Sequence, residues 1–389
     1  MRTAGLLTGI IAGALLAASS AFAVPIVITY QNAAGAGFYD PVLGPARRAC
    51  IEAAAANWAN RLQGTIPVQI TATMIPLGGT ASSAILGGAY ARWTLSNFSV
   101  SVSQNVGYVV AEANQIAGYD LVTAANAGGH PDDDIFVQYN SDVDNDTVLS
   151  TGSFNYATDG KLTISKADGN GIKYYNIDFY QTCLHEMGHG LGFTSGFSQT
   201  TVGAYANADP LIYDTFLATG PAADAPLLTS LTEAQRAAAL ISDGLYWIGA
   251  NARTAAGNTN PRIYAPTTYE KGSSTAHLDE ATYLGTILNA NINELMTPSL
   301  GRGVTHYPGP IVSGVFEDIG WNFLPYSVAD ATAALKDYAG LMSASEAALV
   351  RVHRYNLTTY PGHISLQDVV AVIRAAAGTE TNPYILGTP

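Results

Sequence analysis

The sequence of 389 residues contains little cysteine and few basic residues. Its two cysteines, Cys50 and Cys183, are too few for a disulfide framework. Both fall in segments that we expect to be helical, and either one disulfide between them or two buried free thiols fits that placement. Lysine and arginine number 17 against 30 acidic residues, which gives a formal net charge of −13. This negative charge disfavours nucleic acid and anionic membranes as partners.

Long apolar runs are also missing after the N-terminus. The first residues combine Arg2, an apolar stretch over 5–18 and the small-x-small sequence Ala21-Phe22-Ala23. These are the three parts of a secretory signal peptide. A run of about 14 apolar residues is too short for a hydrocarbon core about 30 Å thick. We therefore expect a signal peptide over 1–23, a secreted mature chain and no membrane span.

Strand and helix patterns follow one another in the first half of the chain. A helix is predicted from about Pro45 to Leu62, and a second from Asn176 or Asp178 to Gly190. Alternating or β-rich segments predict strands at 24–30, 66–75, 134–141 and 161–165. This order predicts an α+β fold with a twisted sheet and two main helices.

The second half is expected to be less regular. From Phe193 to Trp321 the chain is rich in turns, with one helix predicted over 231–241, where Ser230 and Glu233 would form a capping box. Beyond Asn322 two amphipathic patterns predict a small helical appendage. We place the main domain at 24–325 and the appendage at 326–389. Its segment "PGHISLQDVVAVIR" is weakly similar to half of a dockerin repeat, but Leu357, Thr359 and Pro361 occupy the calcium-ligand positions.

The stretch "CLHEMGHGLGFTSG" (183–196) carries the chemistry. His185 and His189 are four residues apart, so on a helix both imidazoles project from one face and can bind one zinc ion. Glu186 lies beside the first ligand, where it could act as general base towards water. Gly188 and Gly190 inside a helix each cost about 1 kcal/mol relative to alanine. Their presence predicts close approach of another segment or of substrate.

The motif resembles that of the metzincin metalloproteases, HExxHxxGxxH or HExxHxxGxxD. His185, Glu186, His189 and Gly192 match in place, but Ser195 stands where the third ligand is expected. Serine is a poor zinc ligand, so the third ligand must lie elsewhere in the chain.

Downstream residues resemble one branch of that family. His277 in "GSSTAHLDEATY" is followed by Met296 in "NELMTP" and by "VFEDIGW" (315–321). This order is similar to leishmanolysin and related secreted bacterial proteases, in which a long insertion separates the motif from a distal histidine. The resemblance covers roughly 30–321. It implies that His277 is the third zinc ligand and that Met296 forms a hydrophobic floor under the metal.

From the residues alone, several other side chains remain candidates for the third metal ligand. They comprise one further histidine, two aspartates and two glutamates: His306, Asp209, Asp214, Glu270 and Glu280.

An acidic run offers a second metal chemistry. It holds six aspartates, at positions 132, 133, 134, 142, 144 and 146. Such oxygen-rich loops suit Ca²⁺, but the spacing of an EF-hand is absent, and a solvated loop without an ion is the favoured interpretation. His130, just before the run, is expected to be exposed.

Together these patterns predict a secreted zinc endopeptidase acting on protein or peptide substrates. His185, His189 and His277 would hold the metal, and Glu186 would be the catalytic base. Substrate would lie extended between the N-terminal sheet and the part that brings His277. Two alternatives stay open: a secreted binding or surface-assembly protein that keeps an inherited zinc site and docks through its appendage, and a zinc hydrolase of non-peptide amides or esters.

Overall fold

The structure is a computed structural model, and it describes most of the chain. The described residues are 22–100, 102–145, 147–150, 152–158, 164–167, 173–222, 224–283, 294–300, 308–339 and 366–377. The predicted signal peptide lies outside these residues except for its last two positions. Within these ranges no helix combines the length and the apolar character needed to cross a membrane.

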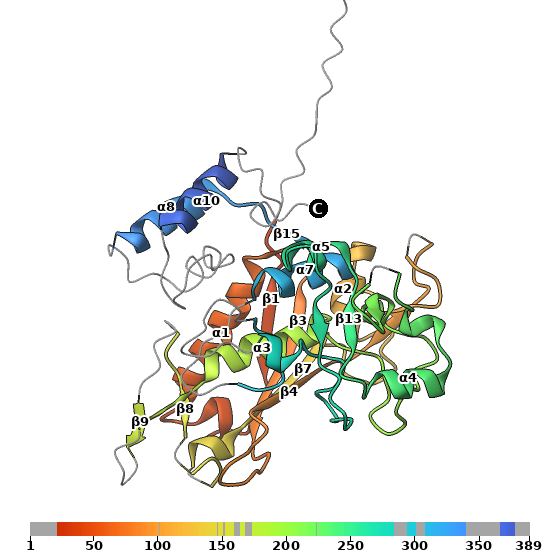
Figure 1. Ribbon diagram of the computed structural model, residues 1–389. Helices are drawn as coiled ribbons and strands as arrows, with labels where there is room; N and C mark the ends of the chain where they lie inside the picture. The colour runs from red at the N-terminus through yellow and green to blue at the C-terminus, as the bar shows by residue number, and fades with distance from the viewer. Residues whose placement is uncertain are drawn as a thin grey trace, which may run out of the picture.

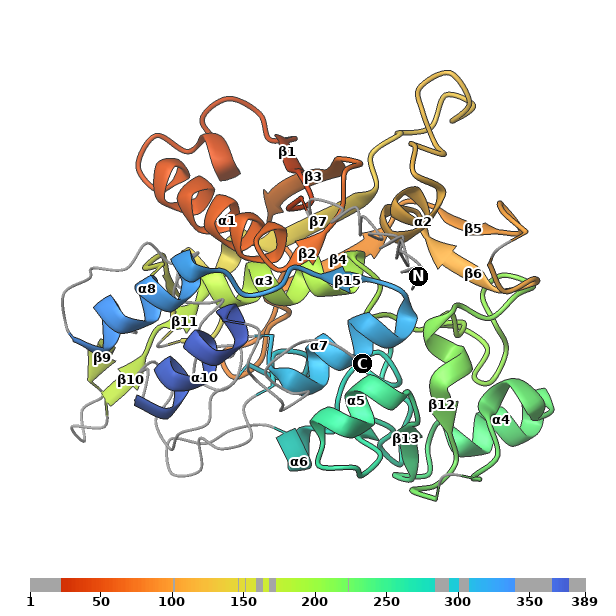
Figure 2. The same cartoon turned by 90° about the horizontal axis from the view of Figure 1, so that it is seen from above.

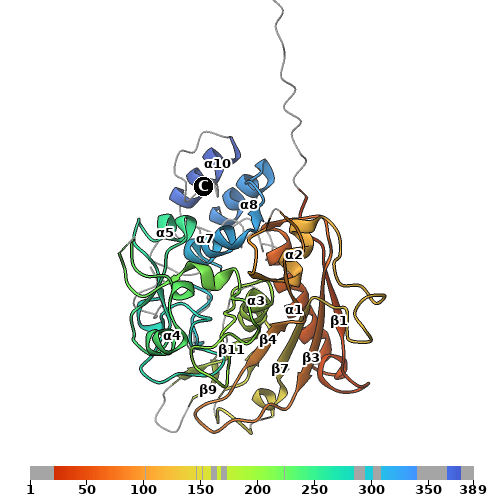
Figure 3. The same cartoon turned by 90° about the vertical axis from the view of Figure 1, so that its right-hand side faces the viewer.

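A four-stranded sheet supports the N-terminal half (Figure 3). Its strand order is β1 (Ile26–Tyr30), β3 (Val68–Ile75), β7 (Ile135–Asn140) and β4 (Gly87–Ala91). The first three strands are parallel, and β4 runs antiparallel to β7 at the edge. Val68, Ile70, Ala72 and Met74 are all buried, so the alternating pattern of 66–75 places one side of β3 in the core.

Two helices cover one face of this sheet and pack against each other (Figures 1 and 3). They are α1 (Gly44–Ala59) and α3 (Phe179–Gly190). Ile51 and Trp58 of α1 are fully buried in the core between them. Since sheet and helices form separate layers, the predicted α+β class is confirmed. Both helix predictions are confirmed as well, within the usual uncertainty of helix ends.

The cysteines of these two helices are not joined. Cys50 and Cys183 are both buried free thiols, and the Cys50 thiol lies 3.1 Å from the Tyr156 carbonyl oxygen, to which it donates a hydrogen bond. Packing of α1 on α3 therefore does not depend on a disulfide.

After α3 the chain builds a second, less regular half around a small antiparallel sheet (Figure 2). This sheet has the order β12 (Leu217–Ala218), β13 (Leu245–Trp247) and β14 (Arg262–Ile263). The helices around it are α4 (Glu233–Ala239), α5 (Ala250–Ala255), α6 (Glu280–Tyr283) and α7 (Pro310–Ile319). The chain then returns to the N-terminal half, because β15 (Asn322–Phe323) pairs with β2 (Leu62–Gln63).

The predicted start of α4 was wrong by two residues. Thr232, not Ser230, is the N-cap, and its capping-box partner is Gln235 rather than Glu233. The Thr232 hydroxyl accepts from the Gln235 N–H at 3.4 Å, while the Gln235 side chain accepts from the Thr232 N–H at 2.9 Å. Ser230 instead ends a short 3₁₀ turn, Leu228–Ser230. The sequence holds two overlapping capping patterns, and the second one forms.

The remaining short elements surround these two halves. They are α2 (Val110–Ala117), β5 (Thr94–Ser96) paired with β6 (Gly107–Val109), β8 (Phe154–Asn155) paired with β11 (Ile177–Asp178), and β9 (Ile164–Ala167) paired with β10 (Lys173–Tyr175). Three further 3₁₀ turns span Gly37–Tyr39, Ser141–Asp144 and Tyr213–Phe216. The first three residues of the strand predicted at 161–165 lie outside the described residues.

Two helices near the C-terminus, α8 (Val328–Tyr338) and α10 (Leu366–Ala376), pack side by side (Figure 1). Their buried residues form a small cluster of their own, separate from the core that runs from Val24 to Trp321. The dockerin-like positions 357, 359 and 361 lie outside the described residues, and the appendage boundary stays a prediction.

Candidate metal centre

Helix α3 carries the HExxH motif and is fixed at both ends. Asp178 is its N-cap, and the Asp178 carboxylate accepts from the Gln181 N–H at 3.0 Å. Near the other end, the Trp321 indole N–H donates to the Leu191 carbonyl at 2.8 Å. His185 and His189 lie one turn apart on this helix, so their rings share a face. The motif therefore sits on a rigid element rather than on a loop.

His277 reaches the same point from the second half of the molecule. Its backbone carbonyl accepts from the Tyr264 N–H at 2.8 Å, just after β14. The next residue, Leu278, donates its N–H to the Met296 carbonyl at 2.7 Å. These two bonds hold His277 between the small sheet and the segment that contains Met296.

The three imidazoles converge through their Nε2 atoms. The Nε2–Nε2 distances are 3.1 Å for His185–His277, 3.1 Å for His185–His189 and 3.2 Å for His189–His277. Among the described residues, this is the group of histidine, cysteine and acidic side chains that could hold a metal ion. The structure thus brings together the three histidines that the sequence and its resemblance predicted.

Backbone carbonyls determine which ring nitrogen carries the proton. The Nδ1 atoms of His185, His189 and His277 lie 3.0, 2.7 and 2.8 Å from the carbonyl oxygens of Leu295, Phe193 and Ser273, respectively. A carbonyl can only accept, so each Nδ1 donates. In a neutral imidazole the Nε2 lone pair is then free. Three lone pairs therefore point at one another, an arrangement that a cation between them would stabilise.

Burial keeps these rings uncharged. It lowers the pKa of His185 to about 4 and that of His189 to about 3. The pKa of His277 is also well below its usual value, first because of burial and then because of the other two rings. His277 is buried, whereas His185 and His189 retain partial exposure. The centre can thus bind a metal without first losing protons.

Glu186 follows His185 on α3, and its side chain lies against the edge strand of the sheet. A Cβ placed on Gly87 of β4 would be 3.0 Å from Glu186 Cγ and 3.1 Å from Oε1. Glu186 is only 6% exposed, and burial raises the pKa of its carboxyl group to about 8. A nearby cation favours the ionised carboxylate, so metal binding and ionisation of Glu186 should be coupled.

Met296 packs directly beneath α3, where the expected close approach to Gly188 occurs. A Cβ on Gly188 would lie 2.8 Å from Met296 Sδ, and one on Gly190 would lie 2.3 Å from Ile135 Cγ2 in β7. Met296 is fully buried. Glycine at these positions lets the methionine segment and the sheet reach the helix backbone. This explains why α3 tolerates two residues of low helix propensity.

Ser195 is engaged with a loop rather than grouped with the histidines. Its hydroxyl donates to the Asp214 carboxylate at 2.8 Å, and the same carboxylate accepts from the N–H groups of Gly196 at 3.0 Å and Leu211 at 2.9 Å. Gly192 has φ of +125°, which turns the chain after the helix and favours glycine. Ser195, at the third-ligand position of the short metzincin motif, therefore stabilises a loop.

The other predicted third ligands have different surroundings. Asp214 holds the loop just described, Glu270 accepts from the Tyr264 hydroxyl at 3.0 Å, and Glu280 accepts from the Ser299 hydroxyl at 2.9 Å. Asp209 lines a separate cavity. His306 lies outside the described residues.

The acidic run is largely engaged with protein donors. Asp134 accepts from the Gln69 N–H at 2.8 Å, Asp133 pairs with Arg92 at 3.0 Å, and Asp144 pairs with Arg47 at 2.6 Å. Within the described part of the chain, no three of these carboxylates converge as the histidines do. Asp146 lies outside that part. His130 is exposed as expected.

Comparison with protein-family models, with curated proteins and with solved structures finds no match to this chain. The resemblance to metzincins therefore rests on the motif residues alone, and the geometry of the centre is the evidence for its chemistry.

Some groups that build the centre were missed from the sequence. The carbonyls of Leu295, Phe193 and Ser273 are backbone groups, which no residue pattern identifies. Glu294 accepts from the N–H groups of Ile311 and Val312, each at 3.1 Å, and so ties the start of α7 to the methionine segment. The sequence shows that Glu294 lies two residues before Met296, but it does not show that Glu294 binds the start of α7.

Proposed function

We propose that the protein is a secreted zinc-dependent endopeptidase with His185, His189 and His277 as metal ligands and Glu186 as general base. The observation that carries this proposal is the convergence of three Nε2 lone pairs beside a buried glutamate. Secretion is supported by the N-terminal sequence pattern.

The donor set fits zinc. Tetrahedral Zn²⁺ with Zn–N distances of about 2.0–2.1 Å needs ligand nitrogens about 3.3–3.4 Å apart. The observed Nε2 separations of 3.1–3.2 Å are close to this. Three histidines leave a fourth position open, as catalytic zinc sites require. When bound there, zinc supplies Lewis acidity that makes water a nucleophile near neutral pH.

The chain's own residues supply the proton transfers. Glu186 lies one residue from His185, and its carboxylate would accept the proton of the attacking water and then donate it to the leaving amine. Burial raises the pKa of this carboxyl group to about 8 before a metal binds, and a bound cation would favour the ionised form that the first role requires. The three carbonyls that accept from the imidazole Nδ1–H groups fix the tautomer and orient the ligands.

Substrate can be accommodated at the edge of the sheet. β4 ends the four-stranded sheet, and among the described strands its outer edge has no partner. Gly87 of β4 lies directly against Glu186. An extended peptide paired with this edge would pass beside the general base, since exposed strand edges bind peptides through main-chain hydrogen bonds. This placement supports a peptide rather than a small ester as substrate.

The test compares the purified secreted protein with two variants. Glu186→Gln should abolish casein hydrolysis but still contain one zinc per chain, as measured by elemental analysis. His277→Ala should lose the zinc. Glu233→Gln on the exposed first turn of α4 is a matched control and should keep both properties. Full hydrolysis by Glu186→Gln, or activity that survives chelation, would refute the mechanism. Hydrolysis of esters without any of peptides would favour the non-peptide alternative.

A further inference from the structure

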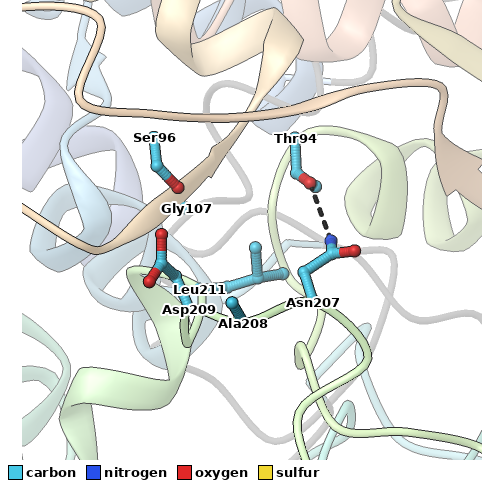
Figure 4. Close-up of a pocket in the computed structure, with 7 residues that line it drawn as sticks. All are labelled: Thr94, Ser96, Gly107, Asn207, Ala208, Asp209 and Leu211. Carbon is cyan, nitrogen blue, oxygen red and sulfur yellow. Dashed lines mark hydrogen bonds between the residues drawn. The ribbon is translucent and has the colours of Figure 1, made fainter.

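A small polar cavity lies between the β5/β6 hairpin and the loop that leads to Leu211 (Figure 4). Its volume is about 160 Å³. Two backbone bonds of 2.8 Å join its walls, from the Gly107 N–H to the Pro210 carbonyl and from the Ile212 N–H to the Gly107 carbonyl. The cavity is thus held by main-chain pairing between two segments about 100 residues apart.

The walls carry oxygen atoms that face one another. In Figure 4 the Ser96 hydroxyl and the Asp209 carboxylate point into the same space from opposite sides. On the other side, Thr94 Oγ1 accepts from the Asn207 amide N–H at 3.1 Å, and in Figure 4 the Asn207 carbonyl oxygen points away from Ser96 and Asp209. Neither the Ser96 hydroxyl nor the Asp209 carboxylate has a hydrogen-bond or ion-pair partner among the described residues.

The floor of the cavity is kept open by a glycine. A Cβ on Gly107 would lie 3.0 Å from Leu211 Cδ2 and 3.8 Å from Ser96 Oγ. A side chain at this position would therefore occupy the space between the two walls. Gly107 has no positive φ, so its backbone conformation does not require glycine. Its contribution is the space that a side chain would fill.

The lining selects the chemistry of the occupant. Its one charged side chain is Asp209, and no basic side chain lines the cavity, so anions are disfavoured. No aromatic ring lines it either, and a sugar would lack a surface for stacking. The groups that face one another are two carboxylate oxygens and a hydroxyl, all of which can accept hydrogen bonds. A planar guanidinium group has five donors and no acceptor, and it matches a carboxylate in a bidentate pair.

From this geometry we propose that the cavity binds a guanidinium group, with Asp209 as its anionic partner and the Ser96 hydroxyl as a further acceptor. The site is separate from the metal centre and does not depend on the proposed hydrolysis. Two sources share this chemistry, free arginine and an arginine side chain within a polypeptide. The volume suits the end of one side chain rather than a larger ligand, because pockets for drug-sized molecules measure about 300–1,000 Å³.

The experiment titrates the full-length secreted protein with N-acetyl-arginine methylamide and follows binding by NMR at low ionic strength. The matched probe is the citrulline derivative, which keeps the shape but lacks the charge. We expect the arginine probe to bind and the citrulline probe to bind at least about fivefold more weakly. Asp209→Asn should weaken binding about fivefold, the scale of a partly exposed ion pair. Asp224→Asn, an exposed acid on another loop, should leave binding unchanged.

Further arms keep the outcome decisive. Ser96→Ala should also weaken binding, and it removes a hydroxyl that no described residue needs. Free L-arginine tests the second source: if it binds and the blocked form does not, the ligand is the free amino acid. Equal binding of the citrulline probe, or unchanged binding by Asp209→Asn, would overturn the proposal.

Discussion

Replacing Gly188 with alanine tests the contact between α3 and the methionine segment. The added Cβ would lie 2.8 Å from Met296 Sδ and 3.5 Å from Trp58 Cζ2, so the buried sulfur has to move by several tenths of an ångström. Such overpacking costs about 1–3 kcal/mol, whereas alanine regains about 1 kcal/mol of helix propensity. We expect a net loss of about 0–2 kcal/mol in the free energy of unfolding.

The metal should respond more strongly than the fold. Leu295 precedes Met296, and its carbonyl holds His185 Nδ1 at 3.0 Å. If Met296 shifts, this carbonyl shifts with it, and loss of such an orienting partner lowers metal affinity about 10- to 100-fold. Zinc affinity would be measured by competition with a chromophoric chelator, and stability by urea unfolding of the metal-free protein.

A double-mutant cycle isolates the contact. Met296→Ala alone should cost about 2–5 kcal/mol because it leaves a cavity. Added to Gly188→Ala it should cost less, since the new methyl enters space that the sulfur vacated. A coupling of about 1 kcal/mol is expected for residues in contact. Additive effects, together with unchanged zinc affinity in Gly188→Ala, would refute the proposed role of Gly188.

Three other perturbations have defined outcomes. Chelation of the metal should lower the Tm and abolish hydrolysis, and zinc should restore both, as followed by calorimetry and casein cleavage. Glu112 is buried without a hydrogen-bond partner in the described structure, and burial raises its pKa well above the usual value. The folded state therefore favours the neutral carboxyl group, and stability is lost as pH rises through the folded-state pKa. The Tm of Glu112→Gln minus that of the parent protein should therefore increase from pH 5 to pH 9, and a difference in Tm that stays constant would contradict this. Ser195→Ala should lose about 1 kcal/mol of stability from its bond to Asp214 but keep one zinc per chain, whereas loss of the zinc would make Ser195 a ligand.

The regular elements near the centre could be predicted because their signals are local. The spacing of His185 and His189 and the cap at Asp178 are properties of one helix, and the alternation in β3 belongs to one strand. The low propensity of Gly188 and Gly190 predicted a close neighbour without naming it. Met296 and Ile135 come from segments far away in the sequence, and only the folded chain shows that they are the neighbours.

The histidine that completes the group was harder to predict for the same reason. Local pattern alone left six candidates, and resemblance selected His277. Its position depends on β14, on the bond from Leu278 to Met296 and on the carbonyl of Ser273, none of which has a sequence signature. Asp214 illustrates the opposite case, since a buried carboxylate that resembles a ligand in the sequence instead accepts three hydrogen bonds from a loop.

The distance along the chain between the ligands has a consequence for folding. His189 and His277 are 88 residues apart, so a metal held by both closes a loop that spans the two halves of the protein. If it restricts the unfolded chain as a disulfide does, a loop of this length corresponds to about 4.6 kcal/mol of chain entropy. Cys50 and Cys183 both lie in the N-terminal half and are not joined in a disulfide, so a bound ion would add a covalent-like link between the two halves. The carbonyls of Ser273 and Leu295 also belong to the second half, so a nascent chain that ends before this half could not bind the ion through all three histidines.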